Sequence, residues 1–504
     1  MTDIASILEE LTSKEEAPKV YSKQVLSNVT RQKLLSYQEP HVIKLVSILV
    51  SKHIALDASD TGIGKTYIAS AVCRELGRRP IIICPKTLIY TWNSVLSFFG
   101  VKSYDIVNYE TLRNGKTYSD SKYKYRTKCP YLDLVDPDPN NLALGPYEWD
   151  VPKDSIIIFD EAHRCKSPSK DSGKLLSSAK QLVKSKVPVL LLSATICEKF
   201  TDVKIPFYLF GIIPYIRNFN HYVLTLRDKY PRYRTRKSDY LTPSDYLAAR
   251  ENAQAMTIYE EIREYTSRIK IKDLGDKFPS NQICCQQFFA EDYGKIQVAY
   301  EEIALLMEEL KNNPGKNHLA QIQKRKQEIE LMKVPIFIEQ AQLYLDDEKS
   351  VIIFVNYLHT LRLISEQLDI RCKIFGEQSM EERHKAIDLF QSNQERIIIC
   401  QIRAGGTGIS LHDLSGNHPR ITLMNFPDSG SNLLQALGRA PRAGAKSTVL
   451  QRIIFVANVD YEKKIMQNIN RKLTNISAIN DGDLDGHKYL LKRITRKVVP
   501  KVKN

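Results

Sequence analysis

No run in the chain approaches the roughly 20 consecutive apolar residues of a membrane-spanning helix, so we expect no membrane partner. The first residues, MTDIASILEELTSKEEAPK, lack the basic and apolar regions of a secretory signal, so no secretion is expected. The nine cysteines are scattered, and none has the paired C-x-x-C spacing of a zinc site. These absences favour a reduced, intracellular protein.

Positive charge is what the chain has in excess. Lys and Arg number 73 against 58 Asp and Glu, which gives a formal net charge of +15 at pH 7. Such a field raises encounter rates with polyanions, so nucleic acid is the leading class of partner, and a solvated basic surface is the alternative. The 504 residues exceed what one hydrophobic core usually supports, so we expect two or more domains.

Short apolar runs alternate with helical patterns in two stretches, residues 31–225 and 346–480. This alternation is typical of parallel sheets covered by helices on both faces, so each stretch is predicted to form an α/β lobe. Between them, residues 226–345 hold few strand signals and long charged helical patterns, which predict a helical insertion. Residues 1–30 form an N-terminal extension, and residues 481–504 form a basic C-terminal tail.

The segment SDTGIGKT, residues 59–66, lies between a strand pattern and a helical pattern, the context of a phosphate-binding loop. Gly62 and Gly64 allow backbone N–H groups to converge on phosphate oxygens, and the start of the next helix adds positive potential. Lys65 is placed to reach the β- and γ-phosphates of a nucleotide, and Thr66 to bind Mg²⁺. An ordinary glycine turn is the alternative.

An acidic pair follows in IIIFDEAH, residues 156–163. Asp160 and Glu161 end a buried strand pattern, and ligands of open α/β sheets bind at the carboxyl ends of strands. Asp160 is expected to hold Mg²⁺, directly or through water, and Glu161 to polarise an attacking water. His163 is expected to link this site to a nucleic-acid groove. A strand followed by an acidic helix cap is the alternative.

The segment QALGRAPRAG, residues 435–444, supplies two arginines three positions apart. A helix is predicted from Asn432, and on it Arg439 and Arg442 would share one face, where two cations can converge on one anion. Because both belong to the second lobe, they would reach a nucleotide in the first lobe only when the lobes close. A basic, solvated helix is the alternative.

In combination these segments resemble the superfamily 2 helicases, specifically the Snf-type branch that includes chromatin-remodelling translocases. The likeness covers roughly residues 31–475 and includes YQEPHVIKL, IIICPKTLIYTWNSVLSFF, IVNYETLR, DEAHRCKSPSK, ICQIRAGGTGISL and QALGRAPRAG. The compact size and the APRAG ending are also similar to versions found in large DNA viruses. The resemblance implies two RecA-like parallel-sheet lobes with a helical insertion between them, with ATP and Mg²⁺ as cofactors. It also implies an intracellular location, either the nucleus or, for a viral protein, a cytoplasmic replication site or the virion.

The resemblance carries roles to particular residues. Gln38 would recognise adenine, and the other nucleotide-binding residues would be Thr61, Gly62, Ile63, Gly64, Lys65, Thr66 and Gly408. Catalysis would depend on Lys65, Asp160, Glu161, Arg439 and Arg442, with Thr66 and Asp160 as metal ligands. The coupling residues would be His163, Ser193, Thr195 and Gln435. The nucleic-acid backbone or the interlobe cleft would be lined by Pro85, Lys86, Gly405, Gly406 and Thr407.

The activity that the resemblance implies is ATP-driven movement along double-stranded DNA, which remodels protein–DNA or transcription complexes, with a polymerase or the transcription machinery as a further partner. Single-stranded DNA and RNA stay open as partners. Ser59 replaces the first glycine of the generic loop, and SAT, residues 193–195, stands where the Snf-type branch usually has Gly-Thr-Pro. Because SAT is common in strand-separating relatives, a DNA or RNA helicase is the alternative. A nucleotide-gated scaffold with little turnover is a third hypothesis.

Two further segments interleave basic residues with tyrosines: KYKYRTK, residues 122–128, and RDKYPRYRTRK, residues 227–237. Such mixtures suit contact with phosphates and occasional stacking on bases. Flexible solvated loops are the alternative for both. Nothing in the sequence supplies a groove-reading helix with a recognisable base code, so we expect backbone-directed, salt-dependent binding.

Overall fold

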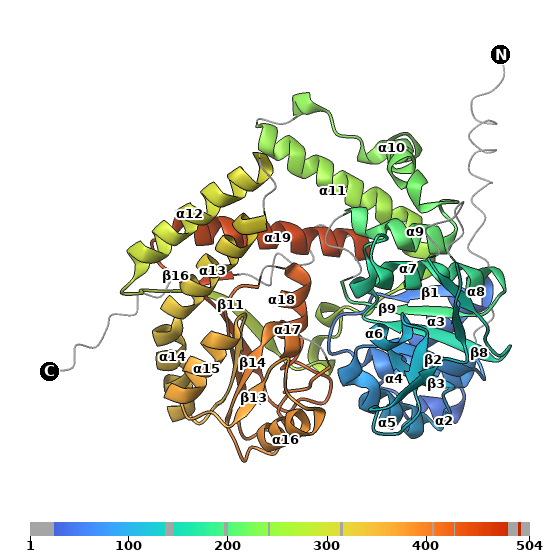
Figure 1. Cartoon of the computed structure of the whole chain (residues 1–504), viewed down its shortest axis with the longest axis horizontal. Coiled ribbons are helices and arrows are strands. Elements are labelled where there is room, and N and C mark those ends of the chain that lie inside the picture. The colour runs from blue at the N-terminus through green and yellow to red at the C-terminus, as the bar shows by residue number, and fades with distance from the viewer. Residues whose placement is uncertain are drawn as a thin grey trace.

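The computed structural model of the chain describes residues 25–136, 145–195, 200–239, 242–312, 316–405, 408–427, 429–481 and 492–494. Two parallel sheets form the cores of two lobes that lie side by side (Figure 1). The predicted α/β class with two RecA-like parallel-sheet lobes is confirmed.

The first lobe contains a six-stranded sheet in the order β10-β1-β9-β8-β2-β3. The strands are β1 (Ile54–Asp57), β2 (Arg79–Cys84), β3 (Asp105–Asn108), β8 (Ser155–Asp160), β9 (Val189–Leu192) and β10 (Thr266–Ser267). All the neighbouring strands pair in parallel. Because parallel strands end at one edge, the loops after β1 and β8 meet there.

Helices cover both faces of this sheet, which explains why its strands are almost continuously apolar. One face packs on α3 (Glu39–Lys52), α4 (Lys65–Glu75) and α5 (Ile89–Phe99). The other packs on α7 (Asp171–Ser178), α8 (Lys180–Lys184), α9 (Lys204–Phe210) and α10 (Phe219–Lys229). Two small hairpins, β4 (Lys116–Tyr118) with β5 (Arg126–Lys128) and β6 (Leu132–Leu134) with β7 (Tyr147–Trp149), follow the short helix α6 (Tyr109–Leu112).

The second lobe contains a seven-stranded sheet in the order β13-β14-β12-β15-β16-β11-β17. Its strands are β11 (Asn281–Phe288), β12 (Ser350–Val355), β13 (Cys372–Ile374), β14 (Ile397–Gln401), β15 (Arg420–Met424), β16 (Val449–Val456) and β17 (Lys492–Ile494). One face packs on α14 (Val334–Asp346) and α15 (Leu358–Gln367), the other on α16 (Met380–Gln391) and α18 (Gly430–Leu437).

Long helices fill most of residues 226–345, as predicted: α11 (Pro243–Ile262), α12 (Tyr293–Asn312) and α13 (Lys316–Met332). The same stretch also contains two strands that were not expected, because β10 joins the first sheet and β11 joins the second. The first has only two residues, and the apolar run of the second, NQICCQQF, is interrupted by glutamines, so neither gives a clear strand pattern. The exact domain boundaries stay a prediction.

A last helix, α19 (Asp460–Asp481), leaves the second lobe and packs along α11 (Figure 1). It thereby connects the second lobe to a helix that packs on the first. Of the predicted N-terminal extension, residues 25–30 are described, and residues 25–27 lead into α2 (Asn28–Arg31). Among the described residues, none of the helices has the length and apolarity that crossing a membrane requires.

Candidate nucleotide site between the lobes

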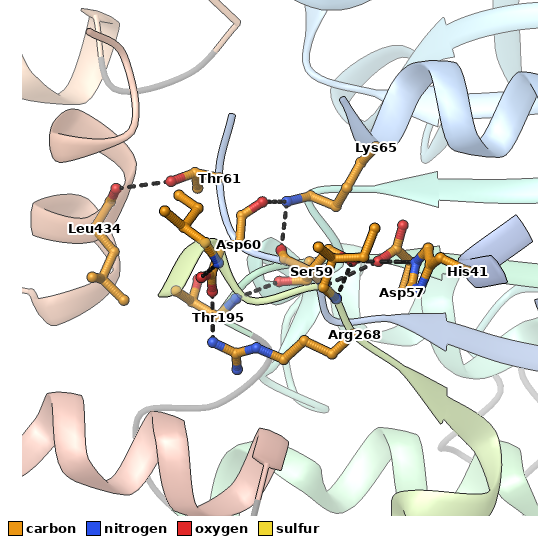
Figure 2. Close-up of polar contacts among 12 residues, drawn as sticks. His41, Asp57, Ser59, Asp60, Thr61, Lys65, Thr195, Arg268 and Leu434 are labelled. Atoms are coloured by element: carbon orange, nitrogen blue, oxygen red, sulfur yellow. Dashed lines mark hydrogen bonds and ion pairs between the residues drawn. The ribbon is translucent and has the colours of Figure 1, made fainter. Parts of the chain in front are cut away.

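The loop between β1 and α4 has the backbone that a phosphate-binding loop requires. Gly62 and Gly64 have φ values of 88° and 94°, a conformation that side-chain-bearing residues rarely adopt. Lys65 begins α4, and its Nζ donates to the carbonyl oxygens of Ser59 and Asp60 at 2.8 and 3.0 Å (Figure 2). The predicted loop residues therefore form one compact turn with the lysine ammonium lying across it.

Gln38 is buried and contacts this same loop. Its Nε2 donates to the carbonyl oxygen of Ile63 at 2.8 Å, and its Oε1 accepts from the backbone N–H of Leu35 at 2.9 Å. A Cβ atom at Gly64 would lie only 2.8 Å from this Nε2, so the glycine is required for the contact. The structure thus joins the glutamine segment to the phosphate loop, and recognition of adenine stays a prediction.

A segment that sequence reasoning did not single out supports the loop from below. Ser59 Oγ accepts from the backbone N–H of Ile269 at 2.9 Å, and Arg268 Nη2 donates to Asp60 Oδ1 at 2.6 Å (Figure 2). Ser59 therefore ties the loop to the chain after β10, a contact that glycine at this position could not make. The replacement of glycine by serine was the only sequence signal that pointed to this support.

A buried histidine completes the support under the loop. His41 Nε2 lies 3.1 Å from Asp57 Oδ1 and 3.2 Å from Ser59 Oγ, and its Nδ1 lies 2.8 Å from Ser267 Oγ. Burial alone would raise the pKa of Asp57, but the charges of His41 and Lys65 together with hydrogen bonds outweigh it and hold the pKa below its ordinary value. The loop thus lies on a polar base contributed by α3, β1 and β10.

The acidic pair lies at the carboxyl end of β8, as predicted. Asp160 Oδ2 accepts from Trp92 Nε1, and Asp160 Oδ1 accepts from the N–H of Glu161, both at 2.9 Å. Glu161 has a φ of 56°, a left-handed conformation that turns the chain sharply and separates the directions of the two carboxylates. Burial, with the nearby charge of Glu161, raises the pKa of Asp160 to about 7, and Lys65 partly opposes the shift.

The chemistry of these donors fits Mg²⁺, which prefers carboxylate and hydroxyl oxygens and keeps several ligands from phosphates and water. Asp160 and Thr66, at the beginning of α4, are the residues that would hold it. The described residues contain no group of three or more His, Cys, Asp or Glu side chains that could hold a metal alone. A cation here would therefore depend on the nucleotide for part of its coordination.

We expect Asp160→Asn to stabilise the nucleotide-free protein at pH 8 and to have little effect at pH 4. The raised pKa means that Asp160 stabilises the fold while protonated, and this contribution is lost as the pH rises from about 4 to about 7. An asparagine stays neutral throughout. Thermal unfolding of both proteins across this range measures the effect, and a difference in Tm that does not change with pH would contradict it.

The two arginines do not lie on a helix, so that part of the prediction is wrong. Helix α18 ends before Arg439, because Gly438 caps it and Pro441 cannot continue it. The guanidinium groups converge by another route: Arg439 Nη1 and Arg442 Nη2 both donate to the carbonyl oxygen of Ile409, at 3.3 and 3.0 Å. An irregular turn, and not helical spacing, brings the two cations together.

Helix α18 and the turn that follows it pack directly on the phosphate loop of the other lobe. Thr61 Oγ1 donates to the carbonyl oxygen of Leu434 at 3.3 Å (Figure 2). The N–H of Ala443 donates to the carbonyl oxygen of Gly62 at 3.4 Å. A Cβ atom at Gly438 would lie 1.9 Å from Thr61 Oγ1, so glycine is needed for the close approach. The lobes are therefore closed against each other at this site.

The arginines lie within electrostatic range of the acidic pair. Burial lowers the pKa of Arg439, and the charges of Glu161 and Asp160 oppose this. Burial and the neighbouring Arg439 lower the pKa of Arg442 to about 9, and Glu161 again opposes the shift. The Nε of Arg442 is buried and has no hydrogen-bond partner among the described residues. An anion such as a terminal phosphate would supply the acceptor that this group lacks.

The four predicted coupling residues form a connected polar chain across the interface. His163 Nδ1 lies 3.1 Å from Ser193 Oγ and 3.4 Å from Glu161 Oε2, while His163 Nε2 lies 2.8 Å from Gln435 Nε2. The backbone N–H of Thr195 donates to Ser193 Oγ at 3.2 Å. One histidine thus contacts Glu161, the SAT segment and the second lobe, and its coupling role stays a prediction.

The residues predicted to line the nucleic-acid path are only partly placed. Pro85 is buried, whereas Lys86 beside it is exposed. Gly408, which was predicted to bind the nucleotide, packs against Thr87 of the first lobe, since a Cβ atom at Gly408 would be 2.8 Å from Thr87 Oγ1. Gly405 ends the short helix α17 (Ile402–Gly405), and the next two residues, Gly406 and Thr407, lie outside the described ranges.

We expect Arg268→Ala to weaken ATP binding by about tenfold, which corresponds to a loss of roughly 1.4 kcal/mol of binding free energy. Loss of the guanidinium removes a contact to Asp60, whose own carbonyl oxygen holds Lys65. Titration with a fluorescent ATP analogue measures the change. Arg263→Ala, which removes an exposed arginine a few residues earlier, should bind as the wild type does; equal affinity in all three proteins would contradict the prediction.

Comparison with known proteins shows the family to which the chain belongs. Residues 333–444 match the family "Helicase conserved C-terminal domain". The chain is 62% identical over 488 residues to "Putative ATP-dependent RNA helicase L364" of Acanthamoeba polyphaga mimivirus, covering 96% of this chain and 91% of that protein. It is 28% identical over 147 residues to "Probable ATP-dependent RNA helicase Dbp45A" of Drosophila melanogaster, covering 28% of this chain and 27% of the fly protein. The chain therefore belongs to the helicases of superfamily 2.

Solved structures with a similar fold include Dbp5 of S. cerevisiae bound to RNA and ADP BeF3, with 12% identity, a TM-score of 0.45, and coverage of 92% of this chain and 96% of that one. The SWI2/SNF2 ATPase core of Sulfolobus solfataricus in complex with double-stranded DNA has 17% identity, a TM-score of 0.33, and coverage of 91% and 94%. Neither likeness bears on the choice of substrate, and membership of the Snf-type branch is not shown.

Proposed function

We propose that this protein is an ATP-dependent helicase that separates the strands of RNA. The observation that carries the ATPase part is the meeting of Lys65, the acidic pair and both arginines at one interface between the lobes. The two relatives named above are named RNA helicases, which supports the strand-separating alternative better than the double-stranded DNA translocase first expected.

Binding of ATP would begin at the phosphate loop. The loop N–H groups and Lys65 would neutralise the β- and γ-phosphates, while Asp160 and Thr66 would hold Mg²⁺. Mg²⁺ would supply further neutralisation of the phosphate oxygens. Glu161, the neighbour of the metal-binding carboxylate, would orient the attacking water and accept its proton.

The arginines make hydrolysis depend on closure of the lobes. Arg439 and Arg442 would stabilise the charge that develops on the γ-phosphoryl group, and they reach it only while the interface is intact. His163 and Gln435 join the same interface by their 2.8 Å contact, so ATP state and lobe position are linked. After hydrolysis the arginines lose their anion, which favours opening and a changed grip on the nucleic acid.

A nucleotide-gated scaffold with little turnover is disfavoured by the same geometry. Binding alone needs neither a carboxylate beside the metal position nor two arginines, Arg439 buried and Arg442 half-buried, within electrostatic range of the acidic pair. Keeping these charges buried is unfavourable unless they are paired or stabilise an anion, so their presence supports turnover.

Nucleic-acid-stimulated ATPase assays, paired with unwinding of a partial duplex, test the proposal. We expect RNA to stimulate hydrolysis more than single- or double-stranded DNA does, and a partial RNA duplex to be separated only with ATP. Absence of stimulation by any nucleic acid would overturn the proposal. Strongest stimulation by double-stranded DNA, with triplex displacement and no strand separation, would restore the translocase hypothesis.

A further inference from the structure

The hairpin of β4 and β5 brings the basic and aromatic segment 122–128 to the interface of the lobes. The rings of Tyr118 and Tyr123 lie 5.4 Å apart, and those of Tyr123 and Tyr90 lie 5.3 Å apart. The ring of Tyr90, on α5, lies 5.7 Å from that of His384, on α16 of the second lobe. These four rings, which we call the ring row, therefore extend from the hairpin across to the other lobe.

The turn of the hairpin is held by one carboxylate. Asp120 accepts from the backbone N–H groups of Lys122, Lys124 and Tyr125 at 3.1, 3.0 and 2.7 Å. Tyr123 has a φ of 54°, and its ring packs into the ring row. The same turn leaves Lys122, Lys124 and Tyr125 exposed, so it presents two cations and one aromatic ring on a fixed loop.

The three cations of this turn are exposed and, within the described ranges, do not pair with carboxylates. Among the described residues, no ion pair involves Lys122, Lys124 or Arg126, and all three side chains are exposed. Lys86 Nζ lies 5.8 Å from the centre of the Tyr118 ring, so the ring row is continuous with the residue expected along the nucleic-acid backbone. Tyr90 is 41% exposed and Tyr125 is 72% exposed.

We propose that the basic-tyrosine surface, formed by Tyr90, Lys122, Lys124, Tyr125 and Arg126, binds an unpaired stretch of the nucleic acid. The exposed rings of Tyr90 and Tyr125 stack on bases, and the three cations contact phosphates. This inference rests on the proposed function and adds where the separated strand is held. A single strand is the occupant, because the faces of bases within a duplex are covered by their neighbours and offer nothing for a tyrosine to stack on.

The second lobe contributes to this surface through His384. Its contact with Tyr90 requires the lobes to be closed, so the end of the ring row is complete only in that state. Opening separates Tyr90 from His384 and changes the environment of a base stacked beside them. Opening and closing of the lobes during the ATP cycle would therefore change how tightly this surface binds the unpaired strand, in addition to any change in backbone contacts.

Two oligonucleotides of equal length test the inference, a single-stranded oligouridylate and the same ribose-phosphate chain without bases. We expect the wild type to bind the base-containing chain at least about fivefold more tightly. This is the change in affinity that corresponds to the smallest usual contribution of one base stacked on an aromatic side chain. The double variant Tyr90→Ala with Tyr125→Ala should lose this preference and bind both chains alike. Tyr90→Phe with Tyr125→Phe should keep it, since phenylalanine also stacks.

Charge variants separate the two kinds of contact. Lys122→Gln with Lys124→Gln should weaken both chains equally and reduce the salt dependence of binding. Tyr215→Ala removes a tyrosine that is exposed elsewhere on the first lobe and should bind both chains as the wild type does.

An alanine double variant that still prefers the base-containing chain to the wild-type extent would overturn the inference. The inference would also be overturned if this same variant lost binding to a duplex while it still bound the single strand as the wild type does. A wild type that shows no stimulation of ATP hydrolysis by any nucleic acid would instead count against the proposed function itself, so the two failures are distinguishable.

Discussion

Glu161→Gln should bind ATP as the wild type does and hydrolyse it about 100- to 10,000-fold more slowly, the usual contribution of a positioned general base. Glutamine keeps the size of the side chain and its contact to His163, whose Nδ1 lies 3.4 Å from Glu161 Oε2. It cannot accept a proton from water. Single-turnover hydrolysis and titration with a fluorescent ATP analogue measure the two effects separately.

Glu148→Gln is the matched control, because it makes the same change at an exposed position on β7 of the same lobe. Its hydrolysis rate should equal that of the wild type. Unchanged hydrolysis in Glu161→Gln would show that this carboxylate is not the base, while loss of ATP binding would assign it a binding role in place of a catalytic one.

Arg442→Ala should reduce the hydrolysis rate about 1,000- to 100,000-fold, the range found for arginines that stabilise phosphoryl transfer. Its Nε is buried without a partner among the described residues, and its Nη2 donates to the carbonyl oxygen of Ile409. Few contacts of the fold depend on it, so the loss should appear in catalysis more than in stability. ATPase rates and thermal unfolding, measured together, test this expectation.

Arg442→Lys separates charge from shape. We expect it to stay well below the wild-type rate, because a lysine cannot present two parallel N–H donors to a phosphate. Arg371→Ala, at a position whose side chain is 73% exposed on the same lobe, should leave the rate unchanged. Wild-type hydrolysis in Arg442→Ala would remove this arginine from the proposed mechanism.

Much of the fold and of the site could be predicted from local patterns. Strand runs such as SIIIFD and VLLL are apolar throughout because helices cover both faces of each sheet, and that property is visible in the sequence. The acidic pair and Lys65 follow strands β8 and β1, so their meeting at one sheet edge was a consequence of the fold.

What could not be predicted depends on contacts between distant segments. Arg268 meets Asp60 across 208 positions, and nothing in its neighbourhood marks it as part of a nucleotide site. The turn that carries Arg439 and Arg442 was expected to be helical, but Gly438 and Pro441 end the helix, and the shared carbonyl of Ile409 then gathers the two side chains. Such convergence is a property of packing, which residue spacing does not record.

The shortness of β10 has a mechanical consequence. Only the turn Arg263–Tyr265 separates α11 from this strand, and the residues that follow hold Ser59 and Asp60. Because α19 of the second lobe packs on α11, a rotation of that lobe would move α11 and, through the short β10, the residues that contact the phosphate loop. A displacement of α19 would therefore reach the phosphate loop even when the lobes are apart at the interface between them.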